Sequence, residues 1–419
     1  MKKTLVGILS GLLFLLPATG CGPQEAGTSS AASSRFSTVA ATSASGLSTT
    51  SPQATDTTAT DTPQTTAKGE NTTTGRETGS STTRATTAAY AAVTKVVSAD
   101  AGKDYFLVAP SQNHPGVVGM DAVYTMQARD KAQNYLAVGD MEVSTNNPAV
   151  QVKGTTLTVP YAVRASADPL VVMVKQKSHP NRTGTYTFHF QKFSAQPTLN
   201  EDFNTESTLF RDGTYETGRD YGNALPGVVE NGNLVYYIEK GGDGFFRTTC
   251  GVFKQAYGCF SARIQMPTKA LVNGAFWLCT AVGDTYIKNP QRPSQSGGEL
   301  DVVEYFPTWG DQKWAATIHW NGWSGYHTNA GKEPQTGTAI RGNYHVYSAV
   351  WTPEAIYWYF DGILSWTYTG EGVQPNSGAM HVMLQASNPG KDSPWGGKYD
   401  PTAFPDVMKT DWVKVYALA

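Results

Sequence analysis

From about Thr94 onward the chain is a succession of short segments in which apolar and polar residues alternate, and this pattern restricts the fold to β structure. The stretch Phe260–Met266 shows it clearly, because Phe, Ala, Ile and Met alternate there with Ser, Arg and Gln. A period of two residues is typical of a strand with one buried face. Asp361-Gly362, between two apolar runs, is a strong hairpin signal. Because convincing helical periodicity is absent, the sequence predicts an all-β protein.

The composition supports this prediction and narrows the function. Only 16% of the 419 residues are charged, whereas the chain holds 42 Gly, 21 Tyr and 10 Trp, which suits a turn-rich β protein. The formal net charge of −2 gives no reason to expect a nucleic-acid partner. All ten Trp lie between Trp277 and Trp412, so any aromatic binding surface belongs to the C-terminal half.

The first 21 residues read as an export signal. Two lysines precede the apolar run Leu5–Leu16, which is short for a membrane span. The small residues that end at Cys21 resemble a bacterial lipobox. We therefore expect an extracellular protein, held at the surface of a bacterial cell by a lipid on Cys21 and contacting the membrane only there. A cleaved signal without lipid is the alternative.

Two further segments precede the C-terminal half. Residues 22–94 are rich in Ser, Thr, Ala and Gly and nearly devoid of large apolar residues, so we expect a disordered linker. Residues 95–197 contain short alternating stretches separated by turns, as in a small antiparallel sandwich. The run Asn147–Gly154 resembles bacterial immunoglobulin-like modules. This segment is interpreted as a spacer, with an accessory binding module as the alternative.

The remaining residues, 198–419, predict one large two-sheet sandwich or jelly roll. Apart from Cys21 this chain has three cysteines, so at most one disulfide can form among them. We favour three buried thiols, although a Cys250–Cys259 bridge is possible. The His and Cys spacing gives no sign of a zinc site.

The segment Glu299–Glu304 carries three acids between apolar strand-forming residues. On a regular strand Glu299 and Asp301 share one face, whereas Glu304 has the wrong parity. A β-bulge that adds one residue corrects the parity, and bulges gather near active sites. The two glutamates then approach the roughly 5–5.5 Å carboxyl separation of retaining glycosidases. Three acids this close separate in pKa, so one glutamate can remain protonated while the other is ionised.

Residues 198–419 resemble glycoside hydrolase family 16. The segment Glu299–Glu304 matches the E-x-D-x-x-E signature of the bulged, laminarinase-like type. Other segments resemble family motifs in the family's order, and they are Phe253–Pro267, Gly274–Leu278, Tyr344–Pro353, Trp358–Gly362 and Asp411–Tyr416.

The resemblance implies a concave β-jelly roll and a retaining double displacement. Its catalytic residues would be Glu299 as nucleophile, Glu304 as acid/base and Asp301 as assistant. We expect an endo-acting hydrolase of a β-linked polysaccharide, best a β-1,3- or mixed-linked glucan. A galactan hydrolase related to agarases and carrageenases is an alternative, because Met383–Ser387 departs from the strand of typical laminarinases. A non-catalytic glycan-binding surface protein is a second alternative.

Sugar rings bind to flat apolar platforms with a few polar groups beside them. Among the aromatic residues near the acidic motif we expect substrate contacts from Trp277, Trp309, Trp314 and Trp323. His319 resembles a cleft histidine of laminarinase-like members, and a buried structural histidine is the alternative.

The expected enzyme requires no cofactor. Many members of the resembled family bind a structural Ca²⁺ through an aspartate of the last strand, which would be Asp411 here. We expect a monomer whose partner is the polysaccharide substrate.

Overall fold

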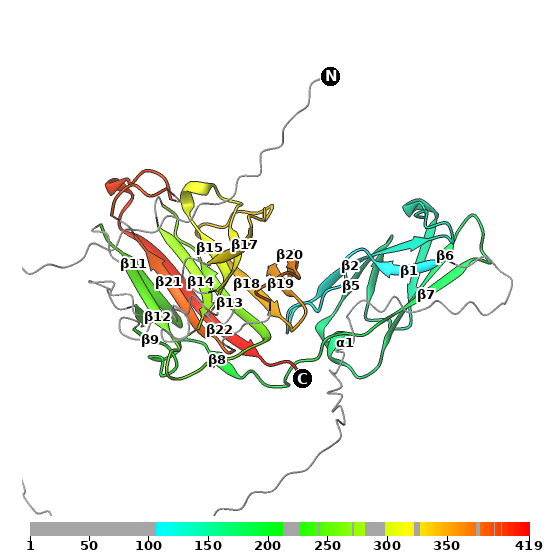
Figure 1. Ribbon diagram of the computed structural model, residues 1–419, viewed down its shortest axis with the longest axis horizontal. Helices are drawn as coiled ribbons and strands as arrows, with labels where there is room; N and C mark the ends of the chain where they lie inside the picture. The colour runs from blue at the N-terminus through cyan, green and yellow to red at the C-terminus, as the bar shows by residue number, and fades with distance from the viewer. Residues whose placement is uncertain are drawn as a thin grey trace, which may run out of the picture. The chain divides into compact units, whose positions relative to one another are not determined.

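The computed structural model describes residues 106–212, 227–240, 244–269, 272–280, 298–321, 327–373, 378–388, 390–394 and 396–419. The predicted signal peptide with Cys21 and the linker 22–94 lie outside the described residues. Those that are described form two bodies built almost entirely from strands (Figure 1). This confirms the all-β prediction.

The smaller body has two antiparallel sheets around its own core. The first sheet, in the order β1-β2-β5-β4, consists of β1 (Leu107–Pro110), β2 (Ala122–Arg129), β5 (Thr156–Val159) and β4 (Gln151–Lys153). The second, in the order β3-β6-β7, consists of β3 (Met141–Thr145), β6 (Leu170–Gln176) and β7 (Thr183–Phe188). Its core includes Val108, Tyr124, Leu157, Val172 and Phe188. The two sheets agree with the predicted sandwich, and the immunoglobulin-like assignment stays a prediction.

Helical structure is scarce in this body. It has a 3₁₀ turn, η1 (Val138–Asp140), and one five-residue helix, α1 (Tyr161–Ala165). Among the residues that the structure describes, helices of the length and apolar character needed to cross a membrane are absent.

The larger body is a sandwich of an eight-stranded and a seven-stranded sheet. The eight-stranded sheet has the order β10-β11-β22-β13-β18-β19-β20, with β8 beside β22. Its strands are β8 (Leu199–Glu201), β10 (Val228–Glu230), β11 (Asn233–Ile238), β13 (Gly258–Gln265), β18 (Tyr344–Trp351), β19 (Ile356–Phe360), β20 (Ile363–Tyr368) and β22 (Asp406–Tyr416).

The seven-stranded sheet has the order β17-β16-β15-β14-β21-β12-β9. Its strands are β9 (Arg211–Asp212), β12 (Gly244–Thr248), β14 (Asn273–Cys279), β15 (Glu299–Tyr305), β16 (Ala315–Trp320), β17 (Thr328–Lys332) and β21 (His381–Ser387). In the described part of the connections lie the 3₁₀ turns η3 (Pro307–Trp309) and η4 (Pro401–Ala403).

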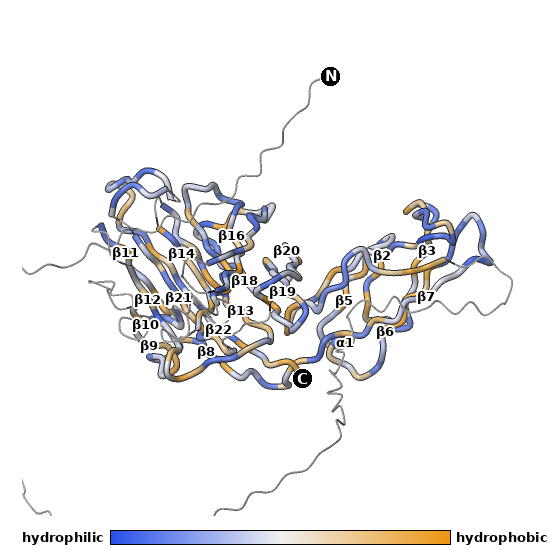
Figure 2. The backbone as a smooth tube through the Cα atoms, viewed as in Figure 1, coloured by the Kyte–Doolittle hydropathy of each residue, from blue (hydrophilic) through white to orange (hydrophobic). Residues whose placement is uncertain are grey.

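One hydrophobic core lies between the two sheets. It takes side chains from both, and its largest members include Trp314, Trp351 and Trp358, all fully buried. The hydrophobic stretches, orange in Figure 2, follow the strands. A core of this kind explains why alternate residues of each strand are apolar, and it confirms the predicted two-sheet sandwich.

A loop of the smaller body, residues 111–121, packs on the outer face of the eight-stranded sheet, within the compact unit Thr83–Ala419. Val117 joins Cys259, Val350 and Tyr359 in a small buried cluster. The buried Arg164 holds the loop, because its guanidinium donates to three loop carbonyls at 2.5–2.7 Å. The loop is therefore a fixed part of this unit.

All three cysteines of the larger body are buried, as predicted. The Sγ of Cys259 is a free thiol, 3.6 Å from the Ser261 hydroxyl oxygen. The Cys250–Cys259 bridge that the sequence left open therefore does not form.

Candidate active site

The acidic motif forms β15, which lies between β14 and β16 and carries the predicted bulge. Along β14, Phe276 lies opposite Val303 while the next residue, Trp277, lies opposite Asp301. Val302 is therefore the extra residue. The pairing of β15 with β16 also shifts between Asp301 and Glu304.

The bulge decides which face each side chain of β15 occupies. Leu300, Tyr305 and both valines of the motif are fully buried in the core between the sheets. Glu299, Asp301 and Glu304 alternate with these residues once the extra valine is counted, so all three acids project from the opposite face of the sheet. Glu299 and Asp301 are buried there, and Glu304 is half-buried. The expectation of three acids on one face is confirmed.

A tryptophan on the eight-stranded sheet stabilises the bulge through a hydrogen bond across the core. The indole nitrogen of Trp358, on β19, donates a hydrogen bond of 2.8 Å to the carbonyl oxygen of Asp301. That carbonyl therefore points into the core rather than along the sheet. A buried carbonyl without a partner is unfavourable, so Trp358 stabilises the irregular strand at the residue where it is needed.

Asp301 begins a chain of polar contacts across two neighbouring strands. His319 Nε2 lies 3.1 Å from Asp301 Oδ2, and His319 Nδ1 lies 3.0 Å from Nε2 of His327. An ionised Asp301 accepts the proton of Nε2, so Nδ1 of a neutral His319 accepts from His327. Burial, with a smaller effect of His319, lowers the pKa of His327 to about 4, which keeps His327 neutral near pH 7.

The sequence pointed to His319 but not to His327. The structure places His319 beside Asp301, opposite Glu299 on β16. His327 has no recognisable motif around it in the sequence. His327 directly precedes β17, so it reaches His319 only when β17 pairs with β16.

Glu304 has a polar neighbour that the sequence also did not reveal. The amide Nδ2 of Asn273, at the start of β14, donates to Glu304 Oε1 at 3.1 Å. Asn273 precedes the Gly274–Leu278 motif, and its parity with Trp277 would have placed it on the same face.

An apolar cluster covers the same face beside the acids. It consists of Phe246, Ala275, Trp277, Cys279 and Met383. Trp277 lies directly opposite Asp301 and 5.7 Å from the ring of Phe246. The structure thus places Trp277 on the site face, where packing with its neighbours leaves only 5% of it exposed.

Trp314, predicted as a sugar contact, lies in the core instead. It is fully buried, and its ring meets that of Tyr347 on the other sheet. The reason is parity: Trp314 alternates in phase with Ala316 and Ile318, which face the core, whereas His319 faces the site. A residue five positions before His319 on the same extended segment must point the other way.

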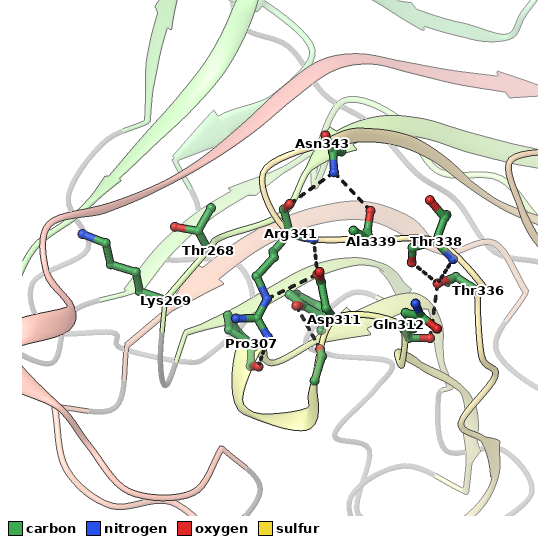
Figure 3. A network of polar contacts seen from close by, with 12 residues as sticks. Thr268, Lys269, Pro307, Asp311, Gln312, Thr336, Thr338, Ala339, Arg341 and Asn343 are labelled. Atoms are coloured by element: carbon green, nitrogen blue, oxygen red, sulfur yellow. Dashed lines mark hydrogen bonds and ion pairs between the residues drawn. The ribbon is translucent and has the colours of Figure 1, made fainter.

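Trp309 lies beyond Glu304 in η3 and is half-buried, with its ring 4.8 Å from Phe306. Arg341 holds this connection, because it donates to the Pro307 carbonyl at 3.1 Å and pairs with Asp311 at 3.3 Å (Figure 3). Trp309 therefore lies on a segment that Arg341 holds in place, just after the acidic strand β15. Trp323 lies outside the described residues.

Asp411 does not fit the predicted calcium ligand. Its carboxylate forms an ion pair of 2.5 Å with Arg263, and a guanidinium beside the carboxylate disfavours a bound cation. In the described ranges, the one group of three closely spaced acidic, His or Cys side chains is Glu299, Asp301 and His319. The hydrogen bond between His319 and Asp301 already accounts for the proximity of those two.

Comparison with known proteins finds similarities over the part of the chain that holds this site. Residues 223–414 match the family described as Glycosyl hydrolases family 16. A beta-glucanase of Rhodothermus marinus is 27% identical over 183 residues, which cover 40% of this chain and 60% of the relative. The endo-1,3-1,4-beta-glycanase ExsH of Rhizobium meliloti is 32% identical over 172 residues, which cover 41% of this chain and 32% of the relative. The chain thus spans less than two thirds of either relative.

Solved structures also match about half of the chain. The laminarinase from Rhodothermus marinus has a TM-score of 0.45 at 21% identity, covering 55% of this chain and 100% of its own. The laminarinase from Flavobacterium sp. UMI-01 has a TM-score of 0.44 at 23% identity, covering 53% and 100%. Residues 223–414 are therefore similar to glycosyl hydrolase family 16, and the bulged acidic strand lies within this matched region.

Proposed function

We propose that this protein is a secreted, retaining endo-β-glucanase in which Glu299 is the nucleophile and Glu304 the acid/base. One observation carries the proposal: the bulge at Val302 brings Glu304 to the face that also holds Glu299 and Asp301. A retaining glycosidase needs two carboxyl groups on the same side of the scissile bond.

In the first step, a carboxylate oxygen of Glu299 bonds to the anomeric carbon of the sugar. The glycosidic bond breaks, and the departing oxygen takes the proton of Glu304. In the second step Glu304 takes a proton from water, whose oxygen displaces Glu299 from the sugar. The anomeric configuration is inverted twice and is therefore retained.

Asp301 has a supporting role in both steps. The hydrogen bond from His319 favours its ionised form, and its negative charge repels the ionised Glu299 that attacks the sugar. When Glu299 bonds to the sugar its charge disappears, so the repulsion is relieved as the intermediate forms. The polar chain through His327 thus fixes the electrostatic environment of the nucleophile.

The proposed substrate is a β-1,3- or mixed-linked glucan. The names of two relatives, a beta-glucanase and an endo-1,3-1,4-beta-glycanase, support this class. The strand β21 places Met383 on the site face opposite Trp277, where it belongs to the apolar cluster beside the acids.

A panel of glycans tests the substrate class. The full chain without its signal should release reducing ends from laminarin or lichenan, and not from agarose or carrageenan. Release from agarose or carrageenan alone would establish a galactan hydrolase. Binding without release from any glycan would establish a non-catalytic glycan-binding protein.

Two variants test the catalytic roles. Glu299→Gln should lose nearly all activity on every substrate. Glu304→Gln should lose activity on polysaccharide yet keep the first step on an aryl glycoside whose leaving group needs no proton. Proton NMR of the first product should show the β anomer. An initial α anomer would contradict the retaining mechanism.

Secretion and lipid anchoring at Cys21 belong to the same proposal and rest on the sequence. Labelling of the expressed chain with a radioactive fatty acid should be lost in Cys21→Ser, while export continues. Equal labelling of the two would contradict the anchor.

A further inference from the structure

We propose that Asn273 is a positioning residue that orients the carboxyl group of Glu304 and favours its ionised form. This inference deepens the proposed function and rests on it. Asn273 Nδ2 donates to Glu304 Oε1 at 3.1 Å, so an amide at the start of the neighbouring strand holds one oxygen of the proposed acid/base.

The register of the sheet brings the two side chains together. Glu304 lies opposite Ala275, and Asn273 is two residues before Ala275, so both project from the same face as diagonal neighbours. Asn273 is half-buried, which removes part of the water that would otherwise compete for Glu304.

The orientation of the amide follows from the charge of its partner. A carboxylate accepts hydrogen bonds and cannot donate, so the nitrogen of the amide must face it. The other end of the side chain, Oδ1, is buried and has no hydrogen-bond partner among the described residues. We attribute this orientation, which leaves Oδ1 unsatisfied, to the contact between Nδ2 and Glu304.

Gly274 allows β14 to place Asn273 where it does. A Cβ at this position would lie 2.9 Å from Met266 Sδ and 3.0 Å from Pro267 Cδ. A larger residue would therefore require a shift of Met266, of Pro267 or of the start of β14. Gly274 is thus linked to the position of Asn273.

The contact has a chemical consequence for both steps. Hydrogen bonds to charged groups are stronger than those to neutral ones, so the amide stabilises the ionised Glu304 that follows proton transfer. It also keeps Oε1 from turning toward the sugar. Loss of the amide should therefore impair proton donation and hold the proton on Glu304 to higher pH.

The pH dependence of kcat tests the inference. In Asn273→Ala and Asn273→Ser, kcat on the glucan should fall about tenfold and the alkaline limb should move up by about one pH unit. Asn273→Asp should move the limb further, because two adjacent carboxyls resist ionising together. On a dinitrophenyl glycoside the formation of the glycosyl-enzyme needs no proton, so its rate should stay within about twofold of the wild-type rate.

Gln385 supplies the matched control. It lies opposite Ala275 on the neighbouring strand, and its amide donates to the Ser387 hydroxyl at 3.1 Å rather than to an acid of the motif. Gln385→Ala should leave the alkaline limb in place. The same shift in this variant would show that any loss of an amide from this face has the effect, and would overturn the inference.

Two further outcomes decide the matter. An unchanged alkaline limb in Asn273→Ala and Asn273→Ser, or equal losses on the glucan and the dinitrophenyl glycoside, would overturn the positioning role. A titration of the ¹³C-labelled Glu304 carboxyl in the folded chain measures the same shift without substrate. The inference thus fails if that midpoint does not rise in the variants, whereas the proposed function fails if the wild-type protein cuts none of the glycans.

Discussion

The indole nitrogen of Trp358 and the carbonyl oxygen of Asp301 join the two sheets of the sandwich through a 2.8 Å hydrogen bond across the core. The carbonyl belongs to the residue before the extra valine, where the ladder with β16 is interrupted. The bond therefore gives the backbone beside the bulge a partner on the opposite sheet. The acidic strand depends in this way on a side chain of the opposite sheet.

Replacement of Trp358 by Phe should impair both stability and catalysis. It keeps most of the buried ring and removes the donor, so we expect a loss of about 1–3 kcal/mol in the free energy of unfolding. Since Asp301 borders the bulge, kcat should fall at least tenfold. Urea unfolding and glucan hydrolysis measure the two effects.

Trp351→Phe is the control for that variant. Its indole nitrogen also donates to a buried carbonyl, that of Val373 at 2.6 Å, but Val373 lies outside the acidic strand. It should lose similar stability with little change in kcat. Equal losses of kcat in both variants would show that Trp358 has no special relation to the site.

Trp314 and Trp309 should respond oppositely to truncation. Trp314→Ala removes a fully buried ring from the core and should destabilise the protein by about 3–5 kcal/mol. Trp309→Ala should leave the midpoint of urea unfolding almost unchanged and raise KM for glucan several-fold. If Trp309→Ala proved as destabilising as Trp314→Ala with KM unaltered, Trp309 would be a packing residue only.

His114 should make the protein less stable in acid. Its Nε2 donates to the Val123 carbonyl at 3.1 Å and its Nδ1 accepts from the Tyr359 hydroxyl at 3.3 Å, an arrangement of neutral histidine. Burial, with a smaller effect of the Arg164 charge, lowers the pKa of His114 to about 4. The unfolded chain protonates near pH 6.5 and the folded chain only near pH 4, so stability falls as the pH falls through this window.

Because of His114, we expect the free energy of unfolding to fall by about 2 kcal/mol between pH 7 and pH 4.5. Urea unfolding at both pH values should show this loss in the wild-type protein and a smaller one in His114→Phe. His179→Phe is the control, because His179 is exposed. An equal loss in His114→Phe and wild type would show that other groups cause the acid sensitivity.

Chelation should leave the protein unchanged. Asp411 is paired with Arg263, an arrangement that does not fit a calcium ligand. Differential scanning calorimetry with and without EDTA should give the same Tm. A Tm that falls with EDTA and recovers with added Ca²⁺ would show a cation site elsewhere in the chain.

The sequence was sufficient to predict the strands and the common face of the three acids, because both follow from local patterns. The alternation of Phe260–Met266 predicted a strand, and the parity of Glu304 required a bulge that the structure confirms. The same parity rule places Trp314 on the face opposite to His319, and therefore in the core. The prediction of Trp314 as a sugar contact was wrong because it relied on closeness to the motif along the sequence.

The partners of the acids were beyond the reach of local patterns. Asn273 reaches Glu304 and Trp358 reaches Asp301 across 31 and 57 residues of chain. Such contacts depend on which strands become neighbours and in what register. These are properties of the whole sandwich, and a single sequence does not display them.

The face of the sheet that holds the acids takes side chains from the adjoining strands β12, β21, β14 and β15, so its composition depends on their register. If β14 were to pair with β15 one position out of step, Phe276 would replace Trp277 above the acids and Trp277 would be driven into the interior. A molecule trapped in that register would keep its strands and lose all catalytic activity. Preparations refolded from denaturant should then contain a mixture of fully competent and wholly inert molecules, and not a uniform population of slower ones.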